Sequence, residues 1–182
     1  MNIIEKNSVA WYVLRVTYQR EITASKALKE LQIEHYVPTV RTRIRNEKGV
    51  SIGWKTEPLI HNYIFVHDSY ENILKLKQSK LDYLRFMMGK DDEGLLSVPQ
   101  YVPDKQMNDF IKVVRTMGFK PVDVNIDLRK GDRVRVLTGP FEGVEGVFIK
   151  MPTRHEKRVV IKIEGVAAVA TMALNASDIE KI

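Results

Sequence analysis

The 182-residue sequence contains no cysteine and no long hydrophobic run. The absence of cysteine excludes disulfides, thiolate chemistry and cysteine-ligated zinc sites. No apolar segment approaches the roughly 20 residues that a membrane-spanning helix needs. The N-terminal segment also lacks the apolar core of a signal peptide, so we expect a cytoplasmic protein that has no membrane partner.

Residues that could form a catalytic or metal site are few. The four histidines stand at positions 35, 61, 67 and 155, without the spacing of metal ligands. No glycine-rich loop precedes a helix, as a phosphate-binding loop does. We therefore expect no enzymatic activity, no bound metal and no cofactor.

The charge balance is only moderately basic. The chain has 29 lysines and arginines against 23 acidic residues, a formal net charge of +6. Such an excess is compatible with an acidic partner such as nucleic acid, and equally with solubility alone. A hydrophobic content of 44% is typical of a globular protein.

Residues 1–118 carry the periodic patterns of an α+β domain. Strands are expected at residues 11–18, 35–45, 58–68 and 84–89, and helices at residues 21–31, 70–80 and between Pro103 and Gly118. In the second strand, alternation places Arg41, Arg43 and Arg45 on one face. Residues 46–54 contain two glycines among polar residues and predict a hairpin tip. The element order predicts an N-terminal antiparallel sheet flanked by helices.

The pattern changes after Gly118. Residues 119–127 contain proline and aspartate without a period, and predict a linker. Beyond it, short strands at residues 133–137, 146–150, 158–163 and 168–172 are separated by glycine turns. This pattern predicts a small C-terminal five-stranded β-barrel over residues 128–182. The chain is thus expected to hold two domains, 1–118 and 128–182.

The stretch GDRVRVLTGPFEGVEGVF, from Gly131 to Phe148, is unusually rich in glycine. Gly139, Gly143 and Gly146 are expected to provide positive φ angles or bulges in a sharply turning sheet. Phe141 lies beside this turn. It either folds onto the barrel as a lid or is displayed to a partner.

This stretch resembles the KOW motif, the strand-turn-strand of the NusG C-terminal domain. The first domain resembles the NusG N-terminal domain in WYVLRV at 11–16, VPT at 37–39, EPLIHNYIFV at 57–66 and PDK at 103–105, in the same order. EPLIHNYIFV is closer still to the specialised RfaH-type paralogues, and the general pattern is that of the UpxY-type antiterminators. The resemblance covers nearly the whole chain.

The resemblance implies a transcription elongation or antitermination factor. In this family the N-terminal domain binds the clamp helices of RNA polymerase, and this binding reduces the frequency of pausing and termination. By similarity, the polymerase-binding residues are Leu59, Ile60, Tyr63 and Phe65. Alternation places Tyr63 and Phe65 on one face of their strand, which is either part of the core or a surface for a partner.

The resemblance also implies roles for the second domain. Phe141, Ile163, Glu164 and Gly165 match the surface that faces ribosomal protein S10 or the termination factor Rho, which favours display of Phe141. Glu57 matches a position that pairs across the two domains in RfaH-like proteins. The β-branched strands of the second domain disfavour helix formation, so we expect an open, monomeric two-domain protein with a stable barrel.

The sequence also departs from the family pattern. His61 and Asn62 stand where many relatives have Pro-Gly or Pro-Asn, which favours a specialised antiterminator of long operons over a housekeeping NusG. The residues that read non-template DNA in RfaH-like proteins are absent, and Lys75 and Lys77 either contact phosphates there or are simply solvated.

The main alternative is a ribosome-associated or general RNA-binding KOW protein. Its binding face would be formed by a group of basic residues on or beside the C-terminal strands: Arg133, Arg135, Arg154, Lys157 and Arg158. No series of aromatic residues accompanies them, although single-stranded RNA recognition favours one.

Overall fold

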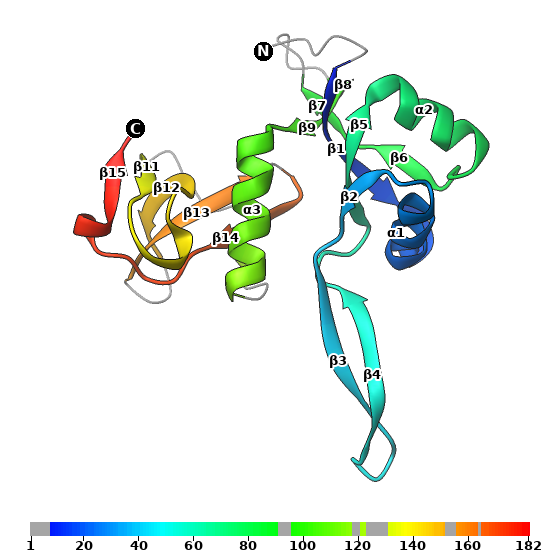
Figure 1. The fold of residues 1–182 in the computed structure, drawn as a ribbon, viewed down its shortest axis with the longest axis horizontal. Helices are drawn as coiled ribbons and strands as arrows, with labels where there is room; N and C mark the ends of the chain where they lie inside the picture. The colour runs from blue at the N-terminus through cyan, green and yellow to red at the C-terminus, as the bar shows by residue number, and fades with distance from the viewer. Residues whose placement is uncertain (1–7, 91–95, 118–120, 123–130, 152–155, 164) are drawn as a thin grey trace. The chain divides into compact units, whose positions relative to one another are not determined.

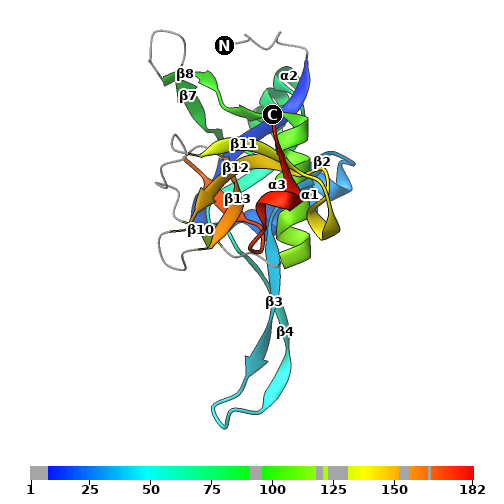
Figure 2. The same ribbon diagram turned by 90° about the vertical axis from the view of Figure 1, so that its left-hand side faces the viewer.

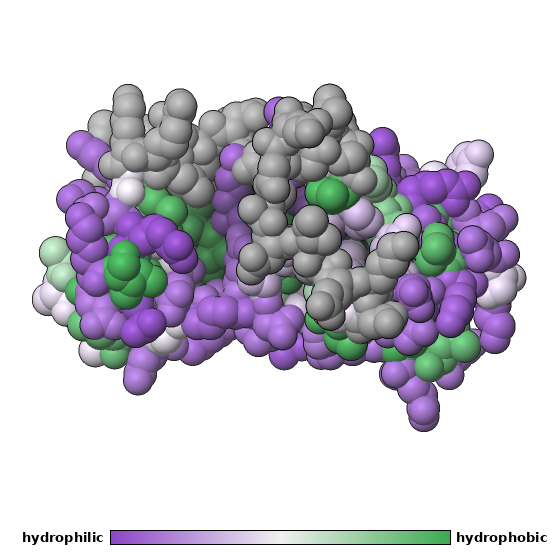
Figure 3. Space-filling model, turned by 90° about the horizontal axis from the view of Figure 1, so that it is seen from above, coloured by the Kyte–Doolittle hydropathy of each residue, from purple (hydrophilic) through white to green (hydrophobic). Residues whose placement is uncertain are grey.

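The structure, a computed structural model, describes residues 8–90, 96–117, 121–122, 131–151, 156–163 and 165–182. The chain divides into two compact units, Met1–Asp104 and Lys105–Ile182. Both contain antiparallel sheets, so the fold is the expected mixture of helices and antiparallel strands (Figure 1). Seen from above, the described residues at the surface are mostly hydrophilic, with hydrophobic residues in separate patches (Figure 3). Nowhere in the described ranges does a helix have the length and apolar character to cross a membrane.

The first unit is built on a five-stranded antiparallel sheet. Its strands are β1 (Val9–Val16), β2 (Glu34–Tyr36), β5 (Tyr63–Ser69), β6 (Leu84–Phe86) and β9 (Tyr101–Val102). The strand order is β2-β5-β1-β6, and β9 pairs with Trp11 and Tyr12 of β1. The central strand β1 is rich in aromatic and aliphatic residues because nearly all of its side chains are buried.

Two helices cover one face of this sheet. They are α1 (Glu21–Glu30) and α2 (Tyr70–Ser79), and the 3-10 turn η1 (Thr17–Gln19) leads from β1 into α1. Ala24 and Leu28 of α1 and Ile73 of α2 share one hydrophobic cluster with Ile64 and Val66 of β5. The Ser69 hydroxyl accepts a hydrogen bond from the Asn72 N–H and so caps α2. The helices predicted at residues 21–31 and 70–80 are therefore confirmed.

Two hairpins extend the first unit. One pairs β3 (Thr39–Arg45) with β4 (Ser51–Pro58), and the other pairs β7 (Met88–Lys90) with β8 (Leu96–Pro99). The single strand expected at 35–45 is interrupted at Val37 and Pro38, since proline lacks the N–H that a paired strand donates. Residues 51–54 belong to β4 and not to the tip. The β3–β4 hairpin projects away from the five-stranded sheet in both ribbon views (Figures 1 and 2).

The second unit contains α3 (Asp104–Met117), except for its first residue, and a six-stranded antiparallel sheet that we call the C-terminal sheet. Its strands are β10 (Pro121–Val122), β11 (Asp132–Val136), β12 (Glu145–Lys150), β13 (Lys157–Ile163), β14 (Ala167–Ala170) and β15 (Ile179–Lys181). Their order is β10-β14-β13-β12-β11-β15. The 3-10 turns η2 (Gly139–Phe141) and η3 (Ala176–Asp178) connect strands within it.

The C-terminal sheet differs from the sequence prediction. No strand pairing among the described residues joins β10 to β15, so the expected closed five-stranded barrel is not found. These two end strands are too short to show alternation in the sequence. The two compact units meet within α3, after Asp104, and the domain bounds 1–118 and 128–182 stay a prediction.

The glycines of the Gly131–Phe148 stretch have distinct structural roles. Gly139 and Gly143 have φ angles of 78° and 81°, which confirms the predicted positive φ at both. Gly146 is needed for space instead. A Cβ atom there would lie 2.6 Å from the Val160 carbonyl oxygen and 2.7 Å from Val159 Cγ1. Only a residue without a side chain lets β12 lie this close to β13.

Replacing Gly146 by alanine should destabilise the second unit by about 1–3 kcal/mol, because the added methyl group overlaps the backbone of β13. Chemical denaturation followed by circular dichroism measures the loss. The matched control is Gly89→Ala, where the nearest atoms to an added Cβ lie at 3.8 Å. Equal stability of the two variants would show that the strand contact is not tight.

Candidate functional site

The turn before β5 is fixed by hydrogen bonds to three other segments. The Leu59 N–H donates to the Pro38 carbonyl at 2.8 Å, and the Val16 N–H donates to the Asn62 carbonyl at 2.8 Å. Asn62 adopts a left-handed φ of 69°, which asparagine tolerates. Its N–H donates at 2.5 Å to the carboxylate of Glu21, which is fully buried in α1. Glu21 therefore positions this turn.

The four residues predicted to bind polymerase lie on this turn and on β5. Leu59 and Tyr63 are half-buried, whereas Ile60 is buried. Phe65 is 0% exposed and lies opposite Val13, with its ring centroid 6.4 Å from that of Tyr36. The structure thus brings the four together but leaves only the side chains of Leu59 and Tyr63 accessible.

The alternation predicted along β5 is present. Ile64 and Val66 belong to the hydrophobic cluster under α1 and α2, and Phe65 and His67 point to the opposite face. His67 stacks on Trp11 with ring centroids 4.9 Å apart, and its Nδ1 lies 2.6 Å from a carboxylate oxygen of Glu34. The face that carries Tyr63 is therefore held by stacked rings and a side-chain hydrogen bond, and not by aliphatic packing alone.

The two lysines predicted to contact DNA have different environments on α2. Lys75 is exposed. Lys77 is half-buried, with its Nζ 4.4 Å from the centroid of the Phe86 ring. Burial, helped by the nearby Arg85, lowers the pKa of Lys77. Lys75 is the more accessible of the two for a phosphate contact.

Glu57 forms its polar contacts within the β3–β4 hairpin. Its carboxylate accepts a hydrogen bond from the Thr42 hydroxyl at 2.6 Å and pairs with the Lys55 ammonium at 2.7 Å. The hydrogen bond from Lys55, followed by that from Thr42, lowers the pKa of Glu57. The hydrogen bond from Thr42 joins β3 to β4, whereas the ion pair with Lys55 lies within β4.

The predicted partner surface of the second unit is covered. Phe141 is 0% exposed and Ile163 is buried, while Gly165 is exposed and Glu164 lies outside the described residues. The display of Phe141 that the family resemblance favours is therefore not seen. The ring takes the lid position that its place beside the turn also allowed.

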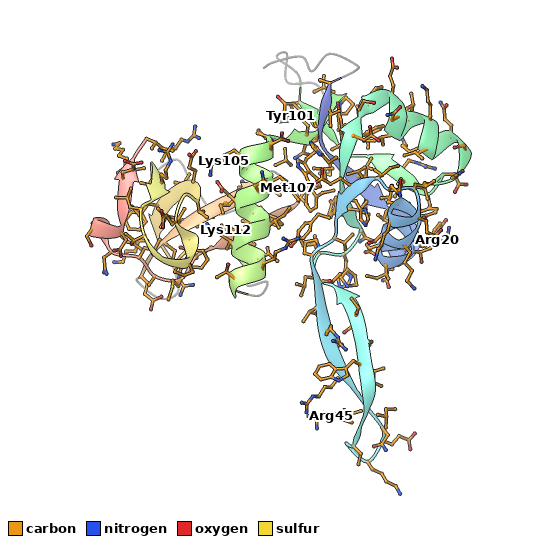
Figure 4. The ribbon with its side chains drawn as sticks, in the orientation of Figure 1. Arg20, Arg45, Tyr101, Lys105, Met107 and Lys112 are labelled. Atoms are coloured by element: carbon orange, nitrogen blue, oxygen red, sulfur yellow. The ribbon has the colours of Figure 1, made fainter. Side chains whose placement is uncertain are left out.

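Helix α3 is hydrogen-bonded to backbone carbonyls next to this surface. The Lys112 ammonium donates to the Glu142 carbonyl at 2.6 Å, and the Lys105 ammonium donates to the Gly143 carbonyl at 2.7 Å. These carbonyls directly follow Phe141. Figure 4 shows Lys105 and Lys112 on the same side of α3. Farther along the sheet, the Gln106 amide donates at 2.7 Å to the carbonyl of Lys162, the neighbour of Ile163.

A buried carboxylate lies at the centre of these contacts. Asp109 Oδ2 accepts the backbone N–H of Glu145 at 2.9 Å and lies 2.5 Å from the Lys105 Nζ. Asp109 is only 6% exposed, so both partners are needed to offset its desolvation. Lys105, Asp109 and Lys112 recur at helical spacing, whereas the prediction of this helix rests on its apolar stripe alone.

Two of the basic residues proposed for RNA binding are paired with acidic side chains. Arg135 pairs with Glu145 at 2.9 Å and with Glu180 at 3.1 Å. Arg158 pairs with Glu156 at 2.8 Å. Arg133 and Lys157 are exposed, and Arg154 lies outside the described residues. Two of the four described cations therefore have their charge compensated within the C-terminal sheet.

No metal site is evident in the described ranges, where no three histidine or acidic side chains converge.

Comparison with known proteins places the chain in a family and relates it to solved structures. Residues 9–111 match the family model described as NusG, transcription termination factor NusG. This match includes all strands from β1 to β9 and the first part of α3. Among solved structures, the chain is similar to one described as "Domain interaction in Thermotoga maritima NusG", with 20% sequence identity and a TM-score of 0.43. That alignment covers 96% of this chain and 98% of the other.

Replacing Asp109 by alanine should loosen α3 from the C-terminal sheet. The change removes the acceptor of the Glu145 N–H, which costs about 1–3 kcal/mol when the donor stays buried. We expect faster amide hydrogen exchange at Val144 and Glu145, measured by NMR. In the control Asp132→Ala, which removes an exposed carboxylate paired with Lys181 at 2.8 Å, exchange at these amides should stay slow. Equal protection in both variants would contradict a role for Asp109 in holding α3.

Proposed function

Because the chain belongs to the NusG family of transcription factors, whose members generally bind RNA polymerase, we propose that it is an elongation and antitermination factor. Its first unit docks on the polymerase clamp helices and suppresses pausing and termination. The observation that carries this proposal is the family match over residues 9–111, which spans most of the first unit. The family consists of transcription factors and not of enzymes.

The docking surface that we propose is the turn before β5 together with the start of that strand. Leu59 and Tyr63 supply the contacts because their side chains are accessible. Ile60 and Phe65 are buried and support the surface from beneath. The buried Glu21 and the hydrogen bonds of Asn62 fix the turn before any partner arrives, which lowers the entropic cost of binding.

Replacing Tyr63 by alanine should weaken binding of the full chain to RNA polymerase core at least about 10-fold, because aromatic residues often carry much of the energy of an interface. A titration by fluorescence anisotropy with the core enzyme and with a clamp-helix fragment measures the effect. The matched control is Tyr18→Ala, which removes a tyrosine that is 83% exposed at another place in the same unit. Unchanged affinity in folded Tyr63→Ala protein would overturn the assignment of this surface.

We propose that the second unit recruits S10 or Rho through Phe141, Ile163, Glu164 and Gly165. Since α3 covers Phe141 through hydrogen bonds to Glu142 and Gly143, binding requires α3 to move away first. The apparent affinity for the partner is then reduced by the fraction of molecules in which α3 is displaced. The helix thus acts as a built-in cover of the recruitment surface.

The variant Asp109→Ala should bind its partner more tightly than the wild type, by about 5- to 30-fold if a loss of about 1–2 kcal/mol falls on the covered state alone. Isothermal titration of both full-length proteins with purified S10 and with purified Rho measures this. Higher affinity for one partner identifies that partner. Equal affinity of variant and wild type would contradict the cover, and absence of binding to both partners would contradict recruitment.

A specialised role on particular long operons is the finer part of the proposal, and it rests on the resemblance of EPLIHNYIFV to the specialised paralogues. Lys75 is an accessible cation for a phosphate of non-template DNA, but a phosphate contact alone carries no sequence information. Run-through assays on templates from long operons and on unrelated templates distinguish the two roles. A housekeeping factor affects both sets equally.

A further inference from the structure

The β3–β4 hairpin carries exposed residues that the proposed function does not use. It projects from the first unit, and Arg45 lies near its outer end (Figure 4). Arg41, Arg43 and Arg45 are exposed, and Trp54 on the opposite strand is 51% exposed. A half-exposed tryptophan beside arginines on a projecting hairpin is not explained by core packing.

The two faces of the hairpin differ in charge. Arg43 lies opposite Trp54 and Arg41 lies opposite Thr56, so these four residues share one face, which we call the arginine face. Alternation along β3 adds Arg45 to it, and the exposed Ile52 of β4, which has no partner on β3 because the register shifts there, lies next to it in the strand. The strand positions on this face include no acidic residue. On the other face, Lys55 is paired with Glu57 and its charge is compensated.

Trp54 organises the arginine face. The guanidinium carbon of Arg41 lies 5.4 Å from the centroid of the indole ring, and that of Arg43 lies 5.1 Å from it. These distances are those of cation–π contacts, which restrain both guanidinium groups. The contacts use the faces of the guanidinium groups and leave their in-plane N–H groups able to donate hydrogen bonds. No carboxylate among the described residues pairs with either group. The ring thus presents two oriented cations to solvent.

We propose that the arginine face binds the phosphate backbone of nucleic acid. Alternate residues on a strand lie about 7 Å apart, so the three arginines form a row of cations that suits a row of phosphates. Guanidinium groups recognise phosphates with paired hydrogen bonds. Because the ring of Trp54 already contacts two guanidinium groups, it serves to orient them, and contact is made through phosphates and not by reading bases.

The observations favour nucleic acid over an anionic membrane. A membrane-binding segment needs a broad apolar face, whereas the arginine face alternates its cations with only Ile52 and Trp54 as large apolar side chains. A two-stranded ribbon also fits the major groove of duplex DNA. A transcription factor works close to duplex DNA, single-stranded DNA and RNA, which share the same phosphate chemistry.

The test is a binding titration of the full-length protein with three labelled nucleic acids and without polymerase, so that its outcome is independent of the proposed polymerase contact. The probes are a 20-base-pair duplex DNA, a single-stranded DNA and a single-stranded RNA of about the same length, a size that exceeds the site of a small domain. The double variant Arg41→Ala/Arg43→Ala should lose at least about 10-fold in affinity for one or more probes at low salt. The slope of log K against log salt should fall by about 2 for duplex DNA.

The matched control is Lys26→Ala/Lys29→Ala, which removes the same charge from exposed positions on α1. It should bind like the wild type. The probe for which the arginine variant loses affinity identifies the nucleic acid. Equal affinity of the arginine and lysine variants for all three probes, or no binding of the wild type to any of them, would overturn the proposal. Phosphatidylserine vesicles serve as a fourth probe. If the arginine variant lost affinity for these vesicles alone, the proposal would also be overturned.

Tryptophan fluorescence gives an independent readout. The chain has two tryptophans, of which Trp11 is only 4% exposed and Trp54 lies on the arginine face. Binding at this face should quench the emission of Trp54, and Trp54→Phe should abolish the quenching while the emission of Trp11 remains. Quenching that persists in this variant would place the nucleic acid elsewhere.

Discussion

The carboxylate of Asp109 determines the state of the second unit. It is buried between the Lys105 ammonium and the N–H of Glu145, and these two partners offset the cost of its desolvation. The same helix places Lys112 on the carbonyl that follows Phe141. One desolvated charge therefore couples the position of α3 to the burial of the ring that the family resemblance assigns to partner binding.

This arrangement is sensitive in a way that an apolar contact is not. Removing one partner of a buried charge costs more than the pair contributes, because the remaining charge is left uncompensated. A binding partner can displace α3 or accept the hydrogen bonds of its lysine ammonium groups. In either case it must also offset the cost of leaving Asp109 without its partners. Such a contact favours two discrete states, α3 on the sheet or α3 away from it, over a continuum of loosened positions.

The sequence predicts those parts of the fold that have a strong local period. The predicted ends of helices α1 and α2 agree with the structure within one or two residues. Each helix has an apolar stripe on one face, with Ala24 and Leu28 in α1 and Ile73 in α2. Strands β10 and β15 were missed because two or three residues show no alternation, and the break at Pro38 was missed because the flanking residues keep alternating. Phe141 was placed beside its turn correctly, but its burial is set by tertiary packing, which no local pattern encodes.

In the first unit, backbone hydrogen bonds connect the two proposed surfaces. The hairpin begins at Thr39 and ends at Pro58, which lie opposite each other, and the Leu59 N–H donates to the carbonyl of Pro38 at the same point. The turn with Leu59 and Tyr63 is thus hydrogen-bonded to the base of the hairpin. A phosphate contact on the arginine face restricts the orientation of that turn. In the same way, docking on a partner through the turn restricts the orientation of the hairpin. Binding at either surface therefore lowers the orientational cost of binding at the other, through the backbone pairing of β3 and β4 and without any change in structure.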